Sequence, residues 1–245
     1  MSRVDYWAEY LESVFGPATD ELGCSVEDDR FDRVFPPRVR KFSSMYWTPV
    51  AVASHAARLL VRKPGTQVLD IGCGPGKFCL IAAAVTEGHF TGIEQRDYLV
   101  KAARDAAMKE RCQNVEIIQG NVTDHSFSKY DAFYLFNPFE ENMFEKHVID
   151  TCVPLSADLY IKYVKYVAAE LCLKPFGTMV VTYMGSALEV PSCYDCELST
   201  FGTDLKLWVK VRETTPDDAH FDIIQRRAAL ERALANYKVP EASRV

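Results

Sequence analysis

The stretch Val68-Leu69-Asp70-Ile71-Gly72-Cys73-Gly74-Pro75-Gly76-Lys77-Phe78 decides the fold of this 245-residue chain. Its first four residues form a short, mainly apolar run typical of a buried strand, and three glycines follow within five positions. Residues 77–85 are apolar and fit a helix. Glycines at a strand-to-helix turn let the backbone reverse tightly and let a ligand approach the main chain. The stretch therefore predicts a strand, a ligand-binding turn and a helix in succession.

The same alternation continues on both sides of this stretch. We expect further strands at 89–94, 115–119, 131–136 and 178–184, and helices at 50–61, 97–111 and 159–172. Alternating strands and helices indicate a parallel sheet with helices on both faces. Residues 196–201 and 205–211 read as two strands with a connection too short for a crossover, so they must pair antiparallel. The prediction is an α/β, doubly wound, seven-stranded and mostly parallel sheet with an antiparallel last strand.

Breaks in the pattern divide the chain into three parts. Residues 1–47 are expected to form an N-terminal helical extension or lid, which includes a short amphipathic helix at 6–15. Residues 48–211 form the sheet domain, whose first helix begins with Thr48 as N-cap and Pro49 at the first helical position. Residues 212–245 are expected to form a C-terminal helix, over 217–237, and a tail.

Charge and cysteine usage limit the partners and the compartment. With 34 acidic and 28 basic side chains, the net charge of -6 argues against a dedicated nucleic-acid binder, which needs a basic field. We interpret the basic run Arg30, Arg33, Arg38, Arg40 and Lys41 as a solvated segment, with contact to RNA or another acidic substrate as the alternative. Eight scattered cysteines are typical of reduced cytosolic proteins. We expect a cytoplasmic chain without a membrane partner, because no apolar run is long enough to cross a bilayer.

Two further features concern the ligand. Cys193 and Cys196 form one C-x-x-C without a second ligand pair, so no metal is expected. Glu94 lies 18 residues beyond Gly76 at the end of the second expected strand, where an acid can accept both ribose hydroxyls of an adenosine. The dinucleotide fingerprint needs a glycine at position 77, which is lysine here, and Asp70 suits a cationic amine. The pattern favours S-adenosylmethionine over a dinucleotide.

Three segments resemble the motifs of class I S-adenosylmethionine-dependent methyltransferases. Residues 68–78 resemble the first motif, Thr91-Gly92-Ile93-Glu94 the acidic second motif, and Gln119-Gly120-Asn121-Val122 stands where the family usually carries Gly-Asp. The resemblance implies that Asp70 lies near the methionine amino group, Glu94 holds the ribose, Gln95 flanks the adenine and Asn121 meets its amino group. The full implied cofactor set is Asp70, Gly72, Cys73, Gly74, Glu94, Gln95, Asn121 and Val122, with S-adenosylhomocysteine as the product.

The reacting end is expected at Asn137-Pro138-Phe139, which closes the fourth strand. This segment resembles the Asn-Pro-Pro-aromatic motif of amino-methylating enzymes, in which the Asn binds the target nitrogen. The chain departs from that motif, with Phe139 at the second proline and Glu140 at the aromatic position. The resemblance makes Asn137 the candidate catalytic residue and Tyr46, Trp47, Pro138, Phe139 and Glu140 the candidate substrate-binding residues. The alternative is that Asn137-Pro138 only ends the strand in a turn.

These observations support one main functional hypothesis. The chain is expected to be a methyltransferase that acts on nitrogen, on a protein side chain or a small-molecule amine. A methyltransferase-like binding module without turnover is the first alternative, and an NAD-dependent oxidoreductase is the second. The sequence leaves the acceptor and the oligomeric state open.

Overall fold

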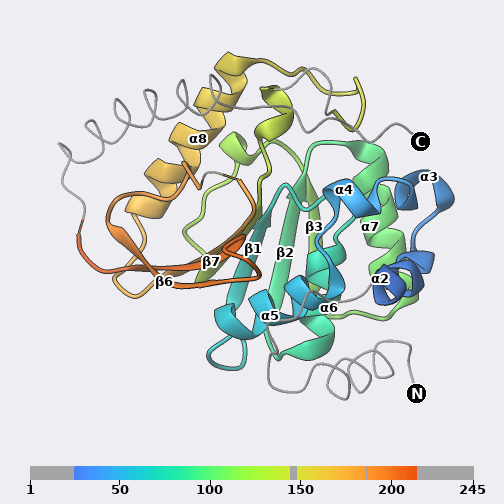
Figure 1. The fold of residues 1–245 in the computed structure, drawn as a ribbon, viewed down its shortest axis with the longest axis horizontal. Coiled ribbons are helices and arrows are strands. Elements are labelled where there is room, and N and C mark those ends of the chain that lie inside the picture. Colours follow the sequence, from blue (N-terminus) through green and yellow to red (C-terminus); the bar gives the residue numbers. More distant parts are fainter. Residues whose placement is uncertain (1–24, 144–147, 186, 214–245) are drawn as a thin grey trace.

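The computed structural model describes residues 25–143, 148–185 and 187–213. Its centre is one seven-stranded sheet with the strand order β3-β2-β1-β4-β5-β7-β6 (Figure 1). The strands are β1 (Gln67–Ile71), β2 (His89–Glu94), β3 (Val115–Gln119), β4 (Ala132–Phe136), β5 (Met179–Tyr183), β6 (Tyr194–Thr200) and β7 (Leu205–Lys210). The first five strands pair parallel, whereas β7 pairs antiparallel with both β5 and β6. The expected sheet, including its reversed end, is confirmed.

Two apolar layers cover the sheet. On one face the helices α5 (Val50–Leu60), α6 (Lys77–Val85) and α7 (Asp97–Lys109) bury their apolar sides against residues such as Phe90 and Tyr134. On the other face α8 (Ala157–Cys172) packs against Phe133 and Val180. Successive strand residues point to opposite faces, which is why neighbours in one strand belong to different layers. Helices therefore lie on both faces, as predicted.

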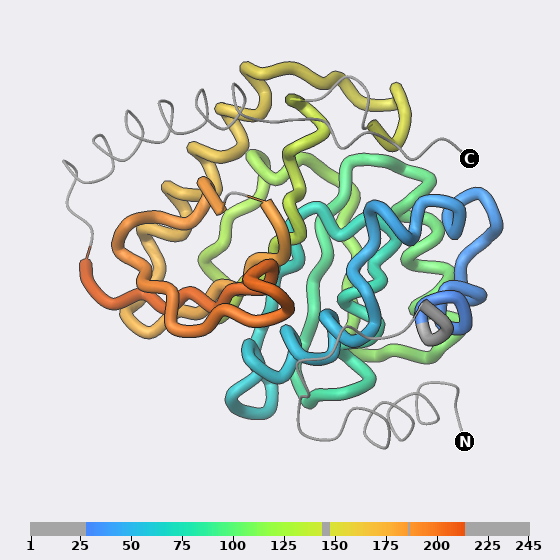
Figure 2. Tube along the Cα trace, in the orientation of Figure 1, coloured from blue at the N-terminus to red at the C-terminus, as the bar shows by residue number. Residues whose placement is uncertain are grey.

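A compact helical segment precedes the sheet domain. It consists of α2 (Ser25–Phe31), the 3-10 helix η1 (Asp32–Val34), α3 (Pro37–Arg40) and α4 (Ser43–Tyr46). Figure 2 traces this segment in blue as a continuous path into α5. Two further 3-10 helices, η2 (Val122–Asp124) and η3 (Glu140–Asn142), follow β3 and β4. The helices expected at 6–15 and 217–237 lie outside the described residues.

The start of α5 differs from the expectation. Helix α5 begins at Val50 with Pro49 as its N-cap, and the Thr48 hydroxyl pairs with the Tyr134 hydroxyl at 3.0 Å instead of capping the helix. The Val50 N–H donates to the Asp28 carboxylate at 3.0 Å. A side chain 22 residues away therefore supplies the capping acceptor, because helix N-termini need an acceptor but not one from the adjacent residue.

Helix α7 ends at Lys109, two residues earlier than expected. Arg96 occupies the N-cap position and Asp97 is the first helical residue. Among the described residues, no helix has the length and apolar content needed to span a bilayer.

Candidate functional site

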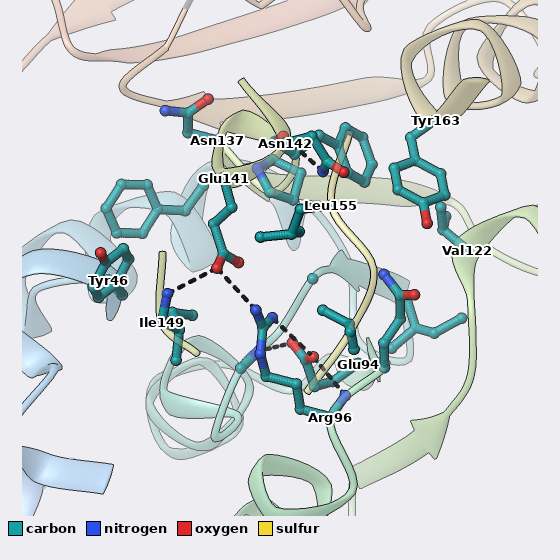
Figure 3. Close-up of a pocket in the computed structure, with 18 of the residues that line it drawn as sticks. Tyr46, Glu94, Arg96, Val122, Asn137, Glu141, Asn142, Ile149, Leu155 and Tyr163 are labelled. Atoms are coloured by element: carbon teal, nitrogen blue, oxygen red, sulfur yellow. Dashed lines mark hydrogen bonds and ion pairs between the residues drawn. The ribbon is translucent and has the colours of Figure 1, made fainter. Parts of the chain in front are cut away.

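A cavity lies at the carboxyl ends of β1, β2, β3 and β4, where four loops meet (Figure 3). This is the edge at which open α/β sheets bind ligands. The cavity volume is about 90 Å³. Its walls include Tyr46, Trp47, Gly72, Gly74, Glu94, Gln95, Arg96, Val122, Asn137, Pro138, Phe139 and Glu141. Ten of the fourteen predicted site residues thus surround one space.

Two glycines of the turn after β1 leave no room for a side chain. Gly72 and Gly74 have φ angles of 75° and 54°. A Cβ on Gly72 would lie 2.7 Å from Pro138, and one on Gly74 would lie 2.7 Å from the Trp47 ring. The Trp47 indole, which donates to the Val39 carbonyl at 3.0 Å, is thereby fixed over the turn. Trp47 and Pro138 thus pack directly on the two glycines of the turn.

Glu94, at the end of β2, is the buried acid of the cavity. Its two carboxylate oxygens accept hydrogen bonds from the Arg96 N–H at 2.8 Å and the Gly74 N–H at 3.2 Å. Burial raises the pKa of Glu94, and both hydrogen bonds and the Arg96 charge oppose the rise. A carboxylate has about four acceptor sites, so Glu94 retains capacity to accept from a ligand hydroxyl. This acceptor group fits the ribose of S-adenosylmethionine.

Asp70 and Cys73 face away from the cavity. The Asp70 carboxyl is contacted by Cys79 Sγ at 3.5 Å, and burial raises its pKa to about 8. The Cys73 Sγ packs on Gly92 of β2, and the Cys73 N–H donates to the Ile93 carbonyl at 3.0 Å. Asp70 therefore lies directly beneath the glycine turn, and its predicted role toward the methionine amino group stays a prediction.

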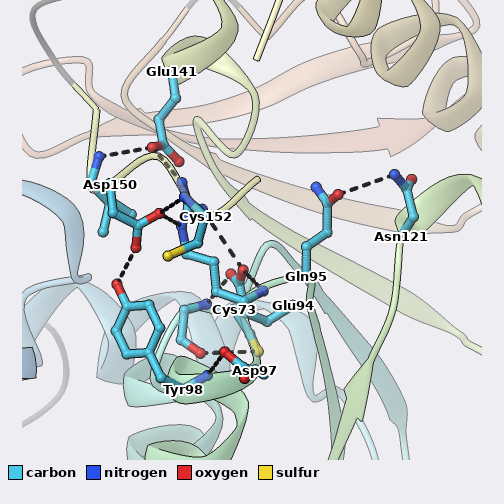
Figure 4. A network of polar contacts seen from close by, with 12 residues as sticks. Cys73, Glu94, Gln95, Asp97, Tyr98, Asn121, Glu141, Asp150 and Cys152 are labelled. Atoms are coloured by element: carbon cyan, nitrogen blue, oxygen red, sulfur yellow. Dashed lines mark hydrogen bonds and ion pairs between the residues drawn. The ribbon is translucent and has the colours of Figure 1, made fainter. Parts of the chain in front are cut away.

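Both polar groups of the Asn121 side chain form hydrogen bonds within the protein. Its side-chain oxygen caps η2 by accepting from the Thr123 N–H at 3.0 Å. Its amide nitrogen donates to Gln95 at 3.2 Å and to the Tyr163 hydroxyl at 3.0 Å. The neighbouring residues Gly120 and Val122, not Asn121, line the cavity. Asn121 thus holds Gln95 in the cavity wall (Figure 4), and its contact with adenine stays a prediction.

Asn137 adopts a left-handed backbone, with a φ of 42°, directly after β4. Asn tolerates this conformation better than most side chains. Its amide nitrogen donates to the Glu140 carboxylate. Gly185 gives the side chain its space, because a Cβ there would lie 2.7 Å from the Asn137 oxygen. Glu140 itself does not line the cavity, whereas Glu141 does.

Lys77 anchors the N-terminal segment to the first turn of α6. Its ammonium group is 2.6 Å from Asp28, 2.9 Å from Asp32 and 3.2 Å from the Ser43 hydroxyl. The Lys77 side chain is only 2% exposed, and burial raises the pKa of Asp32 despite the Lys77 charge. This buried cluster fixes the segment that carries Tyr46 and Trp47 against the glycine turn.

The basic run does not face the candidate site. Arg33, Arg40 and Lys41 line a second cavity of about 680 Å³. Asp28, Asp29 and Asp32 line the same cavity and offset the three positive charges. The Arg38 guanidinium lies 5.5 Å from the centre of the Tyr98 ring. The run therefore mixes with acids in the described structure and does not make a continuous basic surface at the cleft.

The sequence reasoning did not identify three functional neighbours of the site. Arg96 contacts acids on both sides of the cavity, Lys77 anchors the N-terminal segment and Gly185 makes room for Asn137. Only Lys77 carried a local signal, since it is a lone charge at the start of an otherwise apolar helix.

Comparison with known proteins supports this geometry. A family model described as a methyltransferase domain matches residues 62–214, more than half of the chain. Sterol 24-C-methyltransferase ERG6A of Gibberella zeae is 34% identical over 90 residues, which cover 34% of this chain and 24% of that protein. Sterol 24-C-methyltransferase erg6 of Schizosaccharomyces pombe is 26% identical over 186 residues, 73% of this chain and 43% of that protein. The chain spans less than half the length of these curated relatives.

Solved structures share the fold at low sequence identity. The RNA methyltransferase from Salinibacter ruber in complex with S-adenosyl-L-homocysteine has a TM-score of 0.50 and 21% identity, over 69% of this chain and 97% of that chain. TrmN from Thermus thermophilus has a TM-score of 0.52 and 16% identity, over 74% of this chain and 52% of that chain. The sheet order, the glycine turn with Glu94 and the family match agree. The chain belongs to the class I S-adenosylmethionine-dependent methyltransferases.

Proposed function

We propose that this enzyme transfers the methyl group to a nitrogen atom, on a protein side chain or a small-molecule amine, that is presented beside Asn137. The observation that carries the proposal is the hydrogen bonding of Asn137 in the cavity wall. Its amide nitrogen is engaged by Glu140, so its side-chain oxygen remains to accept a hydrogen bond from a substrate N–H. The Asn137 side-chain oxygen therefore favours a methyl-accepting substrate whose nitrogen carries a hydrogen.

The conformation of Asn137 supports a functional role. A positive φ in a non-glycine residue is uncommon, and such residues cluster at active sites because the surroundings must hold them there. Here Glu140 holds the amide group and Gly185 leaves the space that it fills.

S-adenosylmethionine, when bound, supplies an electrophilic methyl group. The residues of this chain then act mainly by positioning, which supplies much of the rate in displacement reactions. Asn137 orients the acceptor nitrogen, and a protonated amine must first lose a proton before its lone pair can react. That proton is released to solvent, because Glu140 holds the Asn137 amide and does not line the cavity.

The cofactor-side residues complete the proposal. Glu94 accepts from the ribose hydroxyls, and Gln95 and Val122 flank the adenine in the cavity wall. The N-terminal residues up to Trp47 act as a cover over residues 48–211, since Trp47 lies on Gly74.

Carbon methylation is a second candidate, favoured by two observations. Two relatives are named sterol 24-C-methyltransferases, and demethylmenaquinone methyltransferase of Listeria welshimeri is 32% identical over 72 residues, 29% of this chain and 30% of that protein. The cavity also carries apolar side chains, Ile149, Val153 and Leu155. An apolar acceptor that lacks an N–H would pack against these residues and would not need Asn137.

Isotope-labelled methyl transfer distinguishes the two candidates. The enzyme is incubated with S-adenosylmethionine labelled in the methyl group and with protein extracts, small primary amines, free adenine, sterols or quinols. We expect label on nitrogen in a protein or an amine, and we expect Asn137→Ala to reduce that transfer at least tenfold while S-adenosylhomocysteine still binds. Asn114→Ala is the matched control, because its amide donates to the Gly88 carbonyl away from the cavity.

The proposal for nitrogen fails if the label is found on carbon of a sterol or quinol. It also fails if Asn137→Ala transfers methyl to an amine as fast as the wild type does.

A further inference from the structure

Arg96 joins three carboxylates that come from three different parts of the chain. Its guanidinium lies 2.8 Å from Glu141 of η3, 3.0 Å from Asp150 in the segment before α8, and 3.9 Å from Glu94 at the end of β2. The Arg96 side chain is only 5% exposed. A single buried cation therefore bridges the cofactor side of the cavity and the loop that follows Asn137.

The loop-side partners of Arg96 are held by further hydrogen bonds. Glu141 also accepts from the Ile149 N–H at 2.9 Å. Asp150 accepts from the Cys152 N–H at 2.9 Å and from the Tyr98 hydroxyl at 2.6 Å. Figure 3 shows Glu141 pointing from its 3-10 turn towards Arg96, with Glu94 beside the same guanidinium. Residues 148–155 and the turn 137–142 are thus fixed to each other through these two acids.

The geometry requires arginine at this position. A guanidinium offers five donors in a planar fork and can address several carboxylates at once, whereas a lysine is a point charge. The Arg96 backbone N–H also donates to Glu94, so main chain and side chain of one residue reach both sides of the cavity. Without the guanidinium, three carboxylates would face one another with no cation among them.

We propose that Arg96 is a positioning residue for methyl transfer. It holds the turn 137–142 and residues 148–155 against Glu94, so that cofactor binding at Glu94 and acceptor orientation at Asn137 are energetically coupled. This inference rests on the proposed roles of Glu94 and Asn137. Coupling between two binding sites is reciprocal, so the effect is measurable from the cofactor side without a known acceptor.

The test measures the response of residues 148–155 to S-adenosylhomocysteine by hydrogen exchange. The variants are Arg96→Met, which removes the charge, and Arg96→Lys, which keeps the charge but not the fork. Arg104→Met is the matched control, because Arg104 lies in α7, which Arg96 precedes as the N-cap, but donates to the Ile117 carbonyl outside the cavity. Calorimetry on each variant supplies the affinity, so that exchange is compared at equal occupancy.

In the wild type and in Arg104→Met, we expect bound S-adenosylhomocysteine to slow exchange of peptides within 148–155 by about tenfold, a usual coupling. In Arg96→Met this slowing should disappear while the glycine turn is still protected, and Arg96→Lys should restore part of it. Glu141→Gln and Asp150→Asn test the same bridge from the loop side and should each weaken the response.

Two results would overturn the inference. The first is equal protection of residues 148–155 in Arg96→Met and in the wild type at equal occupancy. The second applies if Arg96→Met does not fold: it is the full slowing of exchange in both Glu141→Gln and Asp150→Asn. Absence of S-adenosylhomocysteine binding to the wild type is a different result, since it would refute the proposed cofactor role of Glu94. With an acceptor in hand, Arg96→Met should raise the acceptor KM more than the cofactor KM.

Discussion

Replacing Lys77 by methionine tests whether the N-terminal cover is held by a buried charge cluster. Lys77 is 2% exposed, and its partners Asp28 and Asp32 are 23% and 6% exposed. Methionine is similar in length and apolar, so the change removes the charge without opening a large cavity. Most of the lost stability should then come from the uncompensated charge of Asp32, because the more exposed Asp28 can be solvated.

The magnitude follows from the burial of the partners. Removing one member of a buried ion pair costs about 3–5 kcal/mol, because the remaining charge is left uncompensated. Asp28 contributes little since water screens it, which places the expected loss at the lower end, about 3 kcal/mol at pH 8. Urea denaturation followed by circular dichroism measures the free energy of unfolding.

The loss should depend on pH. Burial raises the pKa of Asp32 even beside Lys77, and removal of Lys77 must raise it further. A carboxyl with a raised folded-state pKa contributes stability that is present at low pH and is lost as the pH rises through that pKa. The deficit of Lys77→Met relative to the wild type should therefore be smaller at pH 5 than at pH 8. Adding Asp32→Asn to Lys77→Met should recover part of the stability.

Lys101→Met is the control, because Lys101 pairs with Asp105 on the surface, where the two side chains are 69% and 56% exposed. It should change stability by less than about 0.5 kcal/mol. A loss below about 1 kcal/mol for Lys77→Met at pH 8, or the same loss at pH 5, would show that Lys77 does not hold the N-terminal segment through a buried charge.

Two further substitutions test the site itself. Gly185→Ala should reduce methyl transfer at least tenfold while S-adenosylhomocysteine affinity stays within about threefold, because its Cβ would collide with Asn137. Gly177→Ala is the control, since it has a similar φ of 82° but open space around it, and equal effects of the two would contradict the assignment. Asp70→Asn should remove a pH dependence of stability. Because burial raises the pKa of Asp70 to about 8, its carboxyl is protonated in the folded protein between pH 5 and pH 7 but ionised in the unfolded chain. In this range the free energy of unfolding of the wild type should fall by about 1.4 kcal/mol per pH unit more than that of Asp70→Asn. Parallel curves for the two proteins in urea titrations would contradict the burial of Asp70.

The sheet could be predicted because its signals are local. Alternation of apolar runs and helices, the glycine turn at 72–76 and the short link at 202–204 each act within a few residues, and every expected strand of the domain is present. The predicted N-cap of α5 was wrong because the signal there is not local. Asp28 supplies the capping acceptor from another helix, and no pattern near Thr48 reports it.

Site residues could be predicted where only one residue type meets a local physical requirement, such as a glycine where a side chain does not fit. Gly72 and Gly74 leave no space for a side chain, Glu94 is the acid at the end of β2, and all three line the cavity. Side chains with several possible partners were harder to place, as Asn121 shows by capping η2. The role of Arg96 depends on acids 45 and 54 residues away, a distance at which the sequence carries no pairing information.

Calorimetric titration of S-adenosylhomocysteine into the wild type and Glu94→Gln measures whether Glu94 holds the ribose. Glutamine keeps one acceptor oxygen for the Arg96 or Gly74 N–H but loses the charge and one ribose contact. Since hydrogen bonds to a charged group contribute about 1.5–3 kcal/mol, we expect binding to the wild type and at least a tenfold weaker affinity for the variant. No binding to the wild type, or equal affinities for both proteins, would show that Glu94 does not hold the ribose.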